Sequence, residues 1–318
     1  MAYSAGDTIL DDEYNAFVNN SSSPFGYNHF AGPGSAQYGL NQSTISTVSA
    51  GDTVAASSWN ALFTGMDNIA NHTNVSITAS SVSAGDTVAI RSALITDLAN
   101  LAAAVAGGST SATALDGASS VGSSTNSGTW NSSSTIERSV TFANNNTMRA
   151  FFNAGGFIRI DPSCITGIDG SKDTVFSDLT ATATGNLDLK AQSTTRSGSG
   201  ETQTTNGLSN GFHDLGTGYT VLLKLTSDNS GYTSNTVEYS AKLNAAVSSA
   251  TVLTIKMVST DAADDTTYTG GNLSGVASNP NEAPRMTLAL LASNPNDTQG
   301  LAADITSSSN AEVSNSTS

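Results

Sequence analysis

The stretch Val237-Glu238-Tyr239-Ser240-Ala241-Lys242-Leu243 alternates apolar and polar side chains along its whole length. Successive side chains of a β-strand point to opposite faces, so the odd-numbered residues here share an apolar face and the even-numbered residues share a polar one. A strand of this kind is typical of an antiparallel sheet that has one face in water. The stretch therefore predicts an antiparallel β-domain around it.

Strand-like segments recur on both sides of this stretch. Val, Ile, Thr and aromatic residues favour strands, and Gly, Asn and Ser favour the turns between them. Segments of this composition lie at 139–142, 157–160, 187–190, 220–225, 252–258 and 286–291, with a short helix expected at 147–152. Several short strands joined by polar turns are typical of a sandwich. We therefore predict an antiparallel β-sandwich-like domain over 135–293.

The N-terminal part of the chain contains a repeated motif. The sequence Ser-Ala-Gly-Asp-Thr, followed by Ile or Val, occurs at 4–9, 49–54 and 83–88. Behind the first two copies, an aromatic-Asn-Ala element stands at the same offset, at 14–17 and 59–62, whereas this match fades behind the third copy. Self-similarity of this kind indicates a set of equivalent structural units.

Each copy of the motif predicts a turn, a short extended piece and a helix. Gly-Asp favours a turn, and Thr followed by Ile or Val favours an extended chain. Apolar side chains then follow at helical spacing, namely Trp59, Leu62, Phe63, Met66 and Ile69 after the second copy and Leu94, Leu98, Leu101 and Val105 after the third. Because no such helix buries its apolar face alone, we predict a helical repeat or docking module at 1–106. The predicted fold class is α+β, mainly β.

Two further segments have the composition of connections. Residues 107–134 are rich in Gly, Ser and Thr, which is typical of a flexible linker. Residues 294–318 are mainly Asn, Asp, Ser and Thr, and they predict a polar C-terminal tail that is solvated or runs along a neighbour.

The chain is strongly acidic, since its 318 residues include 26 acidic and 11 basic side chains and its net charge is −15. An acidic protein repels phosphate backbones and anionic lipid, so we expect neither nucleic-acid binding nor membrane insertion. No stretch approaches the ~20 apolar residues of a membrane span. The N-terminus lacks the basic start and the apolar run of a signal peptide, so we expect a protein made in a cytoplasm.

Residues suited to catalysis do not form a known motif. His29, His72 and His213 are the only histidines, and none lies at a metal-ligand spacing. Asp214 follows His213, but no Gly-x-Ser-x-Gly elbow accompanies the pair to indicate a hydrolytic triad. We therefore predict that the protein is not an enzyme and binds no cofactor.

Three carboxylates late in the predicted sandwich are the metal candidate. Asp261, Asp264 and Asp265 lie close together in the sequence, as calcium ligands do, although they do not follow the usual calcium-binding loop. A solvated acidic loop is the alternative. Cys164, the only cysteine, excludes an intramolecular disulfide and is expected to be a small buried residue in or beside a strand.

Aromatic residues of the N-terminal module are the candidates for contact with partners. Phe25, Tyr27 and Phe30 lie in a Gly- and Pro-rich loop, and Trp59 and Phe63 follow the second copy of the motif. Rings in such positions either contact a partner or fold back onto the local core. We predict these aromatics as interaction residues, with core packing as the alternative.

The repeat and parts of the predicted β-domain are similar to a known family. The motif at 50–54 with the element at 59–62 resembles an N-terminal module of tailed-bacteriophage virion proteins, especially those of marine phages. Further segments resemble the β-domain that often follows this module, namely 140–144, 148–149, 151–160 and 232–242. The resemblance covers most of 1–292, and it implies a structural, tail or tail-fibre component without catalytic residues.

We therefore expect a structural protein of a virion that assembles with copies of itself, as a trimer or larger, and with other virion proteins. One alternative is a receptor- or glycan-binding adhesin of a tail fibre that contacts the host-cell surface through Phe25, Tyr27 and Tyr232. Another is a capsid decoration protein. An enzyme such as a depolymerase is a further hypothesis, but no acid pair or nucleophile stands out in the sequence to support it.

Overall fold

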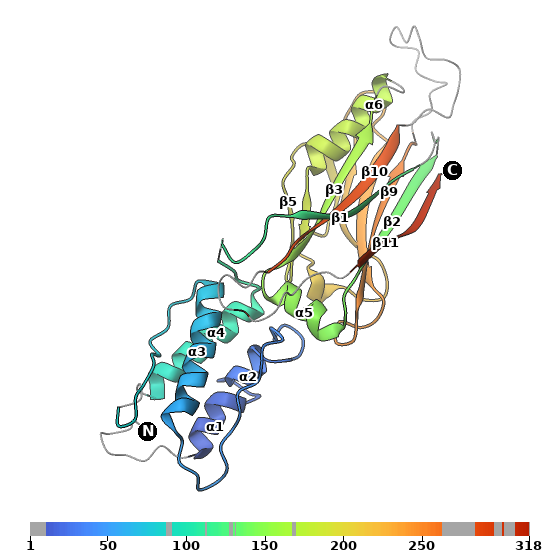
Figure 1. The fold of residues 1–318 in the computed structure, drawn as a ribbon. Coiled ribbons are helices and arrows are strands. Elements are labelled where there is room, and N and C mark those ends of the chain that lie inside the picture. Colours follow the sequence, from blue (N-terminus) through green and yellow to red (C-terminus); the bar gives the residue numbers. More distant parts are fainter. Residues whose placement is uncertain are drawn as a thin grey trace. The chain divides into compact units, whose positions relative to one another are not determined.

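The computed structural model describes residues 11–86, 91–111, 113–126, 130, 132–166, 170–262, 284–295, 301 and 309–317. The chain forms two compact units, each built from separate parts of the sequence. Unit 1 comprises 1–117, 144–156 and 294–306, and unit 2 comprises 118–143, 157–293 and 307–318. Figure 1 shows the helices of unit 1 and the sheets of unit 2.

Unit 1 is helical, and its long helices confirm the predicted pattern of apolar residues. Its helices are α1 (Asp11–Asn19), α2 (Tyr27–Phe30), α3 (Ala56–Thr73), α4 (Arg91–Ala106) and α5 (Asn145–Asn153). The predicted apolar positions of α3 and α4 are buried, with Trp59 and Leu98 each 2% exposed. Helix α3 ends where Asn74 takes the left-handed conformation, with φ of 57°, which is a common way to stop a helix.

Helix α5 confirms the predicted helix at 147–152, but it belongs to unit 1. Its N-cap is Asn144, whose side chain accepts a hydrogen bond from the Thr147 amide, as N-cap residues do. Arg149 donates to the carbonyl oxygen of Pro33 at 2.6 Å, and Asn153 donates to that of Gly39 at 3.1 Å. These contacts with distant residues could not be predicted from the sequence. Because 144–156 belong to unit 1, they interrupt the domain predicted at 135–293.

Unit 2 contains two antiparallel sheets, which confirms the predicted β-sandwich-like architecture. The first sheet has the order β1 (Ser119–Thr125), β10 (Arg285–Ser293), β3 (Phe157–Ile165), β4 (Leu187–Leu189) and β5 (Thr194–Arg196). The second has the order β11 (Ser309–Thr317), β2 (Ser133–Thr141), β9 (Val252–Thr260), β8 (Thr236–Leu243), β7 (Thr220–Thr226) and β6 (Thr202–Asn206).

The core of unit 2 follows from side-chain alternation in the central strands. Along β8, Val237, Tyr239 and Ala241 are fully buried, as predicted. Along β10, Leu288 and Leu290 are buried while Ala289 between them is partly exposed. Apolar faces of this kind are what two packed sheets bury against each other.

A helical segment of unit 2 was not predicted. Helix α6 (Gly170–Ser177) packs on β3, as Figure 1 shows, and continues into the π-helix η1 (Asp178–Thr184). The π-helix contacts β3 of one sheet and both β7 and β8 of the other. A short 3-10 helix, η2, spans Phe212–Asp214.

Two segments predicted as connections contain strands. The predicted linker at 107–134 includes β1, which pairs with β10, and the predicted tail at 294–318 includes β11, which pairs with β2. Both strands are rich in Ser and Thr and lack an apolar face. Their pairing depends on main-chain hydrogen bonds, which any sequence without proline can supply, so composition did not reveal them.

Candidate functional site

Two of the predicted interaction residues form the aromatic core of unit 1. The ring of Trp59, 2% exposed, packs edge-on against Tyr14 with centroids 5.1 Å apart and lies 5.5 Å from the ring of Phe63. Phe63 is itself 3% exposed. Both side chains are therefore part of the core of unit 1.

The segment predicted as a Gly- and Pro-rich loop contains helix α2, and it turns most of its rings inward. Tyr27 and Phe30 are buried and pack on each other with centroids 5.8 Å apart. Burial raises the pKa of Tyr27 to about 12. Phe25 is the exception, because it is partly exposed and stacks on His29 at 4.3 Å. Of the five predicted interaction residues, only Phe25 keeps part of its ring in solvent.

The repeated motif forms exposed turns. In the second and third copies, the amides of Asp52 and Asp86 donate to the carbonyl oxygens of Ser49 and Ser83, each at 3.0 Å. The intervening Gly51 has a φ of 85°, and its counterpart in the third copy has a φ of 94°. A positive φ at the third position of a turn is the reason that glycine stands there. The first copy, at 4–9, lies outside the described residues.

The asparagine that follows each of the first two copies binds the main chain of the residue just before the next copy. The side chain of Asn15 donates to the carbonyl oxygen of Val48 and accepts from its amide, both at 2.9 Å. Asn60 makes the same pair of bonds with Val82, both at 2.8 Å. These bonds explain why the aromatic-Asn-Ala element accompanies those copies, whereas the third copy, which no further copy follows, has Leu94 at the same offset.

A hollow of about 380 Å³ is lined by 53–56, which follow the turn of the second copy, by Trp59 and by 82–86, which include the turn of the third. One oxygen of the Asp86 carboxylate already accepts a hydrogen bond from the Ser83 amide at 2.7 Å. The remaining lining is mostly small and neutral. The hollow therefore shows no group arranged to recognise a particular ligand.

The calcium candidate is only partly described. Asp264 and Asp265 lie outside the described residues. Asp261 lies just beyond the end of β9, and its carboxylate is 2.7 Å from the ammonium of Lys172. Within the described ranges, no three His, Cys, Asp or Glu side chains gather as metal ligands do.

The histidines and the cysteine have structural surroundings. His72 is buried, and its Nε2 lies 2.8 Å from the carbonyl oxygen of Ala154, so the neutral ring donates there; burial lowers its pKa. The carboxylate of Asp214 accepts from the Gly211 amide in the turn of η2. Burial raises the pKa of the Cys164 thiol to about 11, which keeps it protonated at neutral pH.

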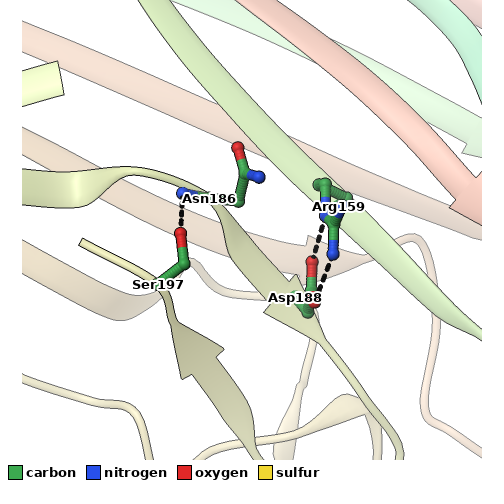
Figure 2. A network of polar contacts seen from close by, with 4 residues as sticks. All are labelled: Arg159, Asn186, Asp188 and Ser197. Atoms are coloured by element: carbon green, nitrogen blue, oxygen red, sulfur yellow. Dashed lines mark hydrogen bonds and ion pairs between the residues drawn. The ribbon is translucent and has the colours of Figure 1, made fainter. Parts of the chain in front are cut away.

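An ion pair crosses the outer face of the first sheet, as Figure 2 shows. Arg159 on β3 lies opposite Asp188 on β4 and donates to both carboxylate oxygens, at 2.6 and 2.9 Å. Beside it, the hydroxyl of Ser197 accepts from the amide of Asn186 at 2.7 Å. The two side chains of the pair are 29% and 16% exposed, so water screens it, and it acts as a cross-strand contact.

Strand β6 is the described surface that best fits a partner. It pairs with β7 on one side and forms an edge of the six-stranded sheet on the other. All its residues are exposed, namely Thr202, Gln203, Thr204, Thr205 and Asn206. An edge strand presents a row of main-chain groups that another strand can pair with. Strand β6 was not predicted, because Thr-Gln-Thr-Thr-Asn has no alternation of apolar and polar residues.

A half-buried arginine fixes the start of this edge. Arg196, at the end of β5, donates to the carbonyl oxygen of Ala183 at 2.5 Å and to that of Gly200 at 2.9 Å. These bonds hold the chain where it passes from the first sheet to the second. The position of β6 is thus determined although its side chains are in solvent.

Comparison with family models, with curated protein sequences and with solved structures finds no match for this chain. Among the described helices, none is both long and apolar enough to cross a membrane.

Proposed function

We propose that the protein is a non-catalytic structural component of a bacteriophage virion, which assembles with copies of itself and with other virion proteins. The observation that carries the assembly part of this proposal is the exposed edge strand β6. The virion part rests on the resemblance of the repeat and of the β-domain segments to virion proteins. Within the described part of the chain, the structural contacts of His72, Asp214 and Asp261 support a non-catalytic role.

The exposure of β6 is the first argument for assembly. A strand that is exposed on both faces buries little apolar surface, so it contributes little hydrophobic stabilisation to the single chain. It instead presents a row of main-chain donors and acceptors along the edge of the sheet. A second strand added to that edge forms main-chain hydrogen bonds without needing any deep pocket.

The charge of β6 is the second argument. The whole chain carries a net charge of −15, so two copies repel each other over most of their surface. Strand β6 contains only Thr, Gln and Asn, and two copies can approach there without placing like charges opposite each other. A second copy of this chain is therefore the partner that we assign to the edge.

Two symmetric arrangements use this edge. Two β6 strands can pair about a two-fold axis, which gives a dimer. Alternatively, β6 of one copy pairs with the opposite edge strand, β11, of the next copy, and a closed ring of three or more copies results. The second arrangement matches the trimer or larger assembly expected from the sequence.

Light scattering coupled to size exclusion, on the full chain over a range of concentrations, tests this proposal. We expect oligomers for the unchanged protein and monomers for Thr205→Lys, because the new charges oppose each other or obstruct the edge. Thr233→Lys, at an exposed loop position of the same unit, is the matched control and should assemble normally.

Normal assembly of Thr205→Lys would reject the β6 contact, and a chain that stays monomeric at all concentrations would reject self-assembly. The virion assignment is tested separately by mass spectrometry of purified particles. The chain should be found there in many copies, and its absence from particles would reject a virion role.

A further inference from the structure

Unit 2 contains an ion pair that is almost completely shielded from water. The ammonium Nζ of Lys172, on α6, lies 2.7 Å from Oδ2 of Asp261, and their side chains are 2% and 1% exposed. The other described lysine pair, Lys224 with Glu238, is 3.4 Å apart with side chains 36% and 26% exposed. The Lys172 pair is therefore both closer and far more deeply buried.

Rigid surroundings hold Lys172 in this position. One helical turn further along α6, Phe176 is fully buried, and its ring packs against Trp130 with centroids 5.1 Å apart. The indole of Trp130 donates in turn to the carbonyl oxygen of Pro284 at 2.8 Å. Helix α6 is thus fixed against its neighbours close to the lysine.

The main chain around Asp261 is held equally firmly. Its own amide donates to the carbonyl oxygen of Ser132 at 3.1 Å. The next amide, of Ala262, donates to the side chain of the buried Asn235 at 2.9 Å. The carboxyl group therefore has little freedom to move away from the amine.

Burial changes the chemistry that is open to such a pair. Charged groups lose their hydration in an apolar interior, which favours transfer of the proton from the ammonium to the carboxylate. Such a transfer would leave a neutral amine, which is a nucleophile, beside a neutral carboxylic acid. The carboxylate oxygen at 2.7 Å is bonded directly to Cγ, so Nζ is close to the ~3–3.5 Å separation of a near-attack arrangement.

We propose that Lys172 and Asp261 join in an intramolecular isopeptide bond. The Nζ lone pair attacks Cγ of Asp261, a C–O bond breaks, and one oxygen leaves as water with two of the protons shared by the two groups. An ammonium and a carboxylate thereby become a neutral amide and one water molecule. No oxidant, reductant or further reactant is required.

The bond would tie two distant parts of unit 2 together. The two residues are 89 positions apart in the sequence, so the amide closes a long loop between α6 and the end of β9. A covalent cross-link of this kind restricts the unfolded chain, as a disulfide does, and it is insensitive to reducing agents. This modification is independent of whether the protein assembles through β6.

Mass spectrometry of the full chain, unfolded before measurement, tests the proposal. We expect a mass lower than that of the sequence by one water molecule. Because dehydration at Asp116-Gly117 or Asp169-Gly170 would cause the same loss, a tryptic digest must locate the bond. The expected product is a branched peptide in which 160–190, uncut after Lys172, is joined to 257–285.

Lys172→Arg preserves the positive charge but removes the nucleophilic amine, so its branched peptide and its loss of water should both disappear. Lys242→Arg, on the outer face of β8, is the matched control and should keep both. If the unchanged protein yields 160–172 and 257–285 as separate peptides with no branched product, the proposal is wrong. This result is decisive even if Lys172→Arg fails to fold.

Discussion

The central and the edge strands of unit 2 differ in composition and in how they are held. The central strands β2, β3, β4, β7, β8, β9 and β10 contain the apolar residues that form the core, and each matches a segment predicted from the sequence. The edge strands β1, β5, β6 and β11 are mostly Ser, Thr and Asn, and none of them was predicted. Apolar alternation therefore identifies the strands that have a buried face, but it does not identify the strands at the edges of a sheet.

The edges also differ from one another. On one side of the sandwich, Arg138 of β2 donates to the Ser123 carbonyl oxygen of β1 at 2.7 Å, and Asn315 of β11 donates to that of Thr125 at 3.0 Å. These bonds join the two sheets. On the other side Arg196 holds the chain at the end of β5, while β6 beyond it is exposed along its whole length. The β6 edge is thus the more exposed of the two, and we therefore assign the first contact with a partner to it.

The largest expected effect is on a central strand. Ile255 lies in the middle of β9 and is fully buried, so Ile255→Ala should lower the free energy of unfolding by about 2–5 kcal/mol, because it leaves a cavity. Val258→Ala, on the partly exposed face of the same strand, should cost about 1 kcal/mol or less. Chemical denaturation of both variants measures the difference, and equal losses would contradict the assigned faces of β9.

An intermediate effect is expected on the side of the sandwich where Arg138 joins β2 to β1. Arg138 is 6% exposed, and Arg138→Met removes its bonds to Ser123 and Ser124, so we expect a loss of about 1–3 kcal/mol. Amide exchange should also become faster in β1 and β11 than in β8. Unchanged exchange in both edge strands would show that Arg138 does not join the sheets.

The candidate site was harder to predict than the fold. Trp59 and Phe63 were identified as important because they are large and apolar, but sequence alone could not decide between a core and a surface. The function of Asn15 and Asn60 was also invisible, since each binds main-chain groups of Val48 and Val82 far along the chain. Only the coincidence of these asparagines with the repeat was a signal of their role.

The buried ion pair was likewise not predictable from the sequence. Lys172 and Asp261 are separated by 89 positions, and nothing in their local sequence distinguishes them from solvated charges. Their burial results from the packing of α6 on β3 and from the end of β9, which only the folded chain brings together. Long-range contacts of polar residues leave no periodic trace in a sequence.

The smallest effect on stability is expected at β6, where the consequence for assembly is greatest. Substitutions at its exposed residues should change the free energy of unfolding by no more than about 0.5 kcal/mol. The direct measurement is hydrogen exchange of the amides of 202–206 in the full chain at low and at high protein concentration. We predict that these amides become protected as the concentration rises, while those of the central strand β8 keep their rates. Oligomers that form without added protection in β6 would contradict the proposed contact.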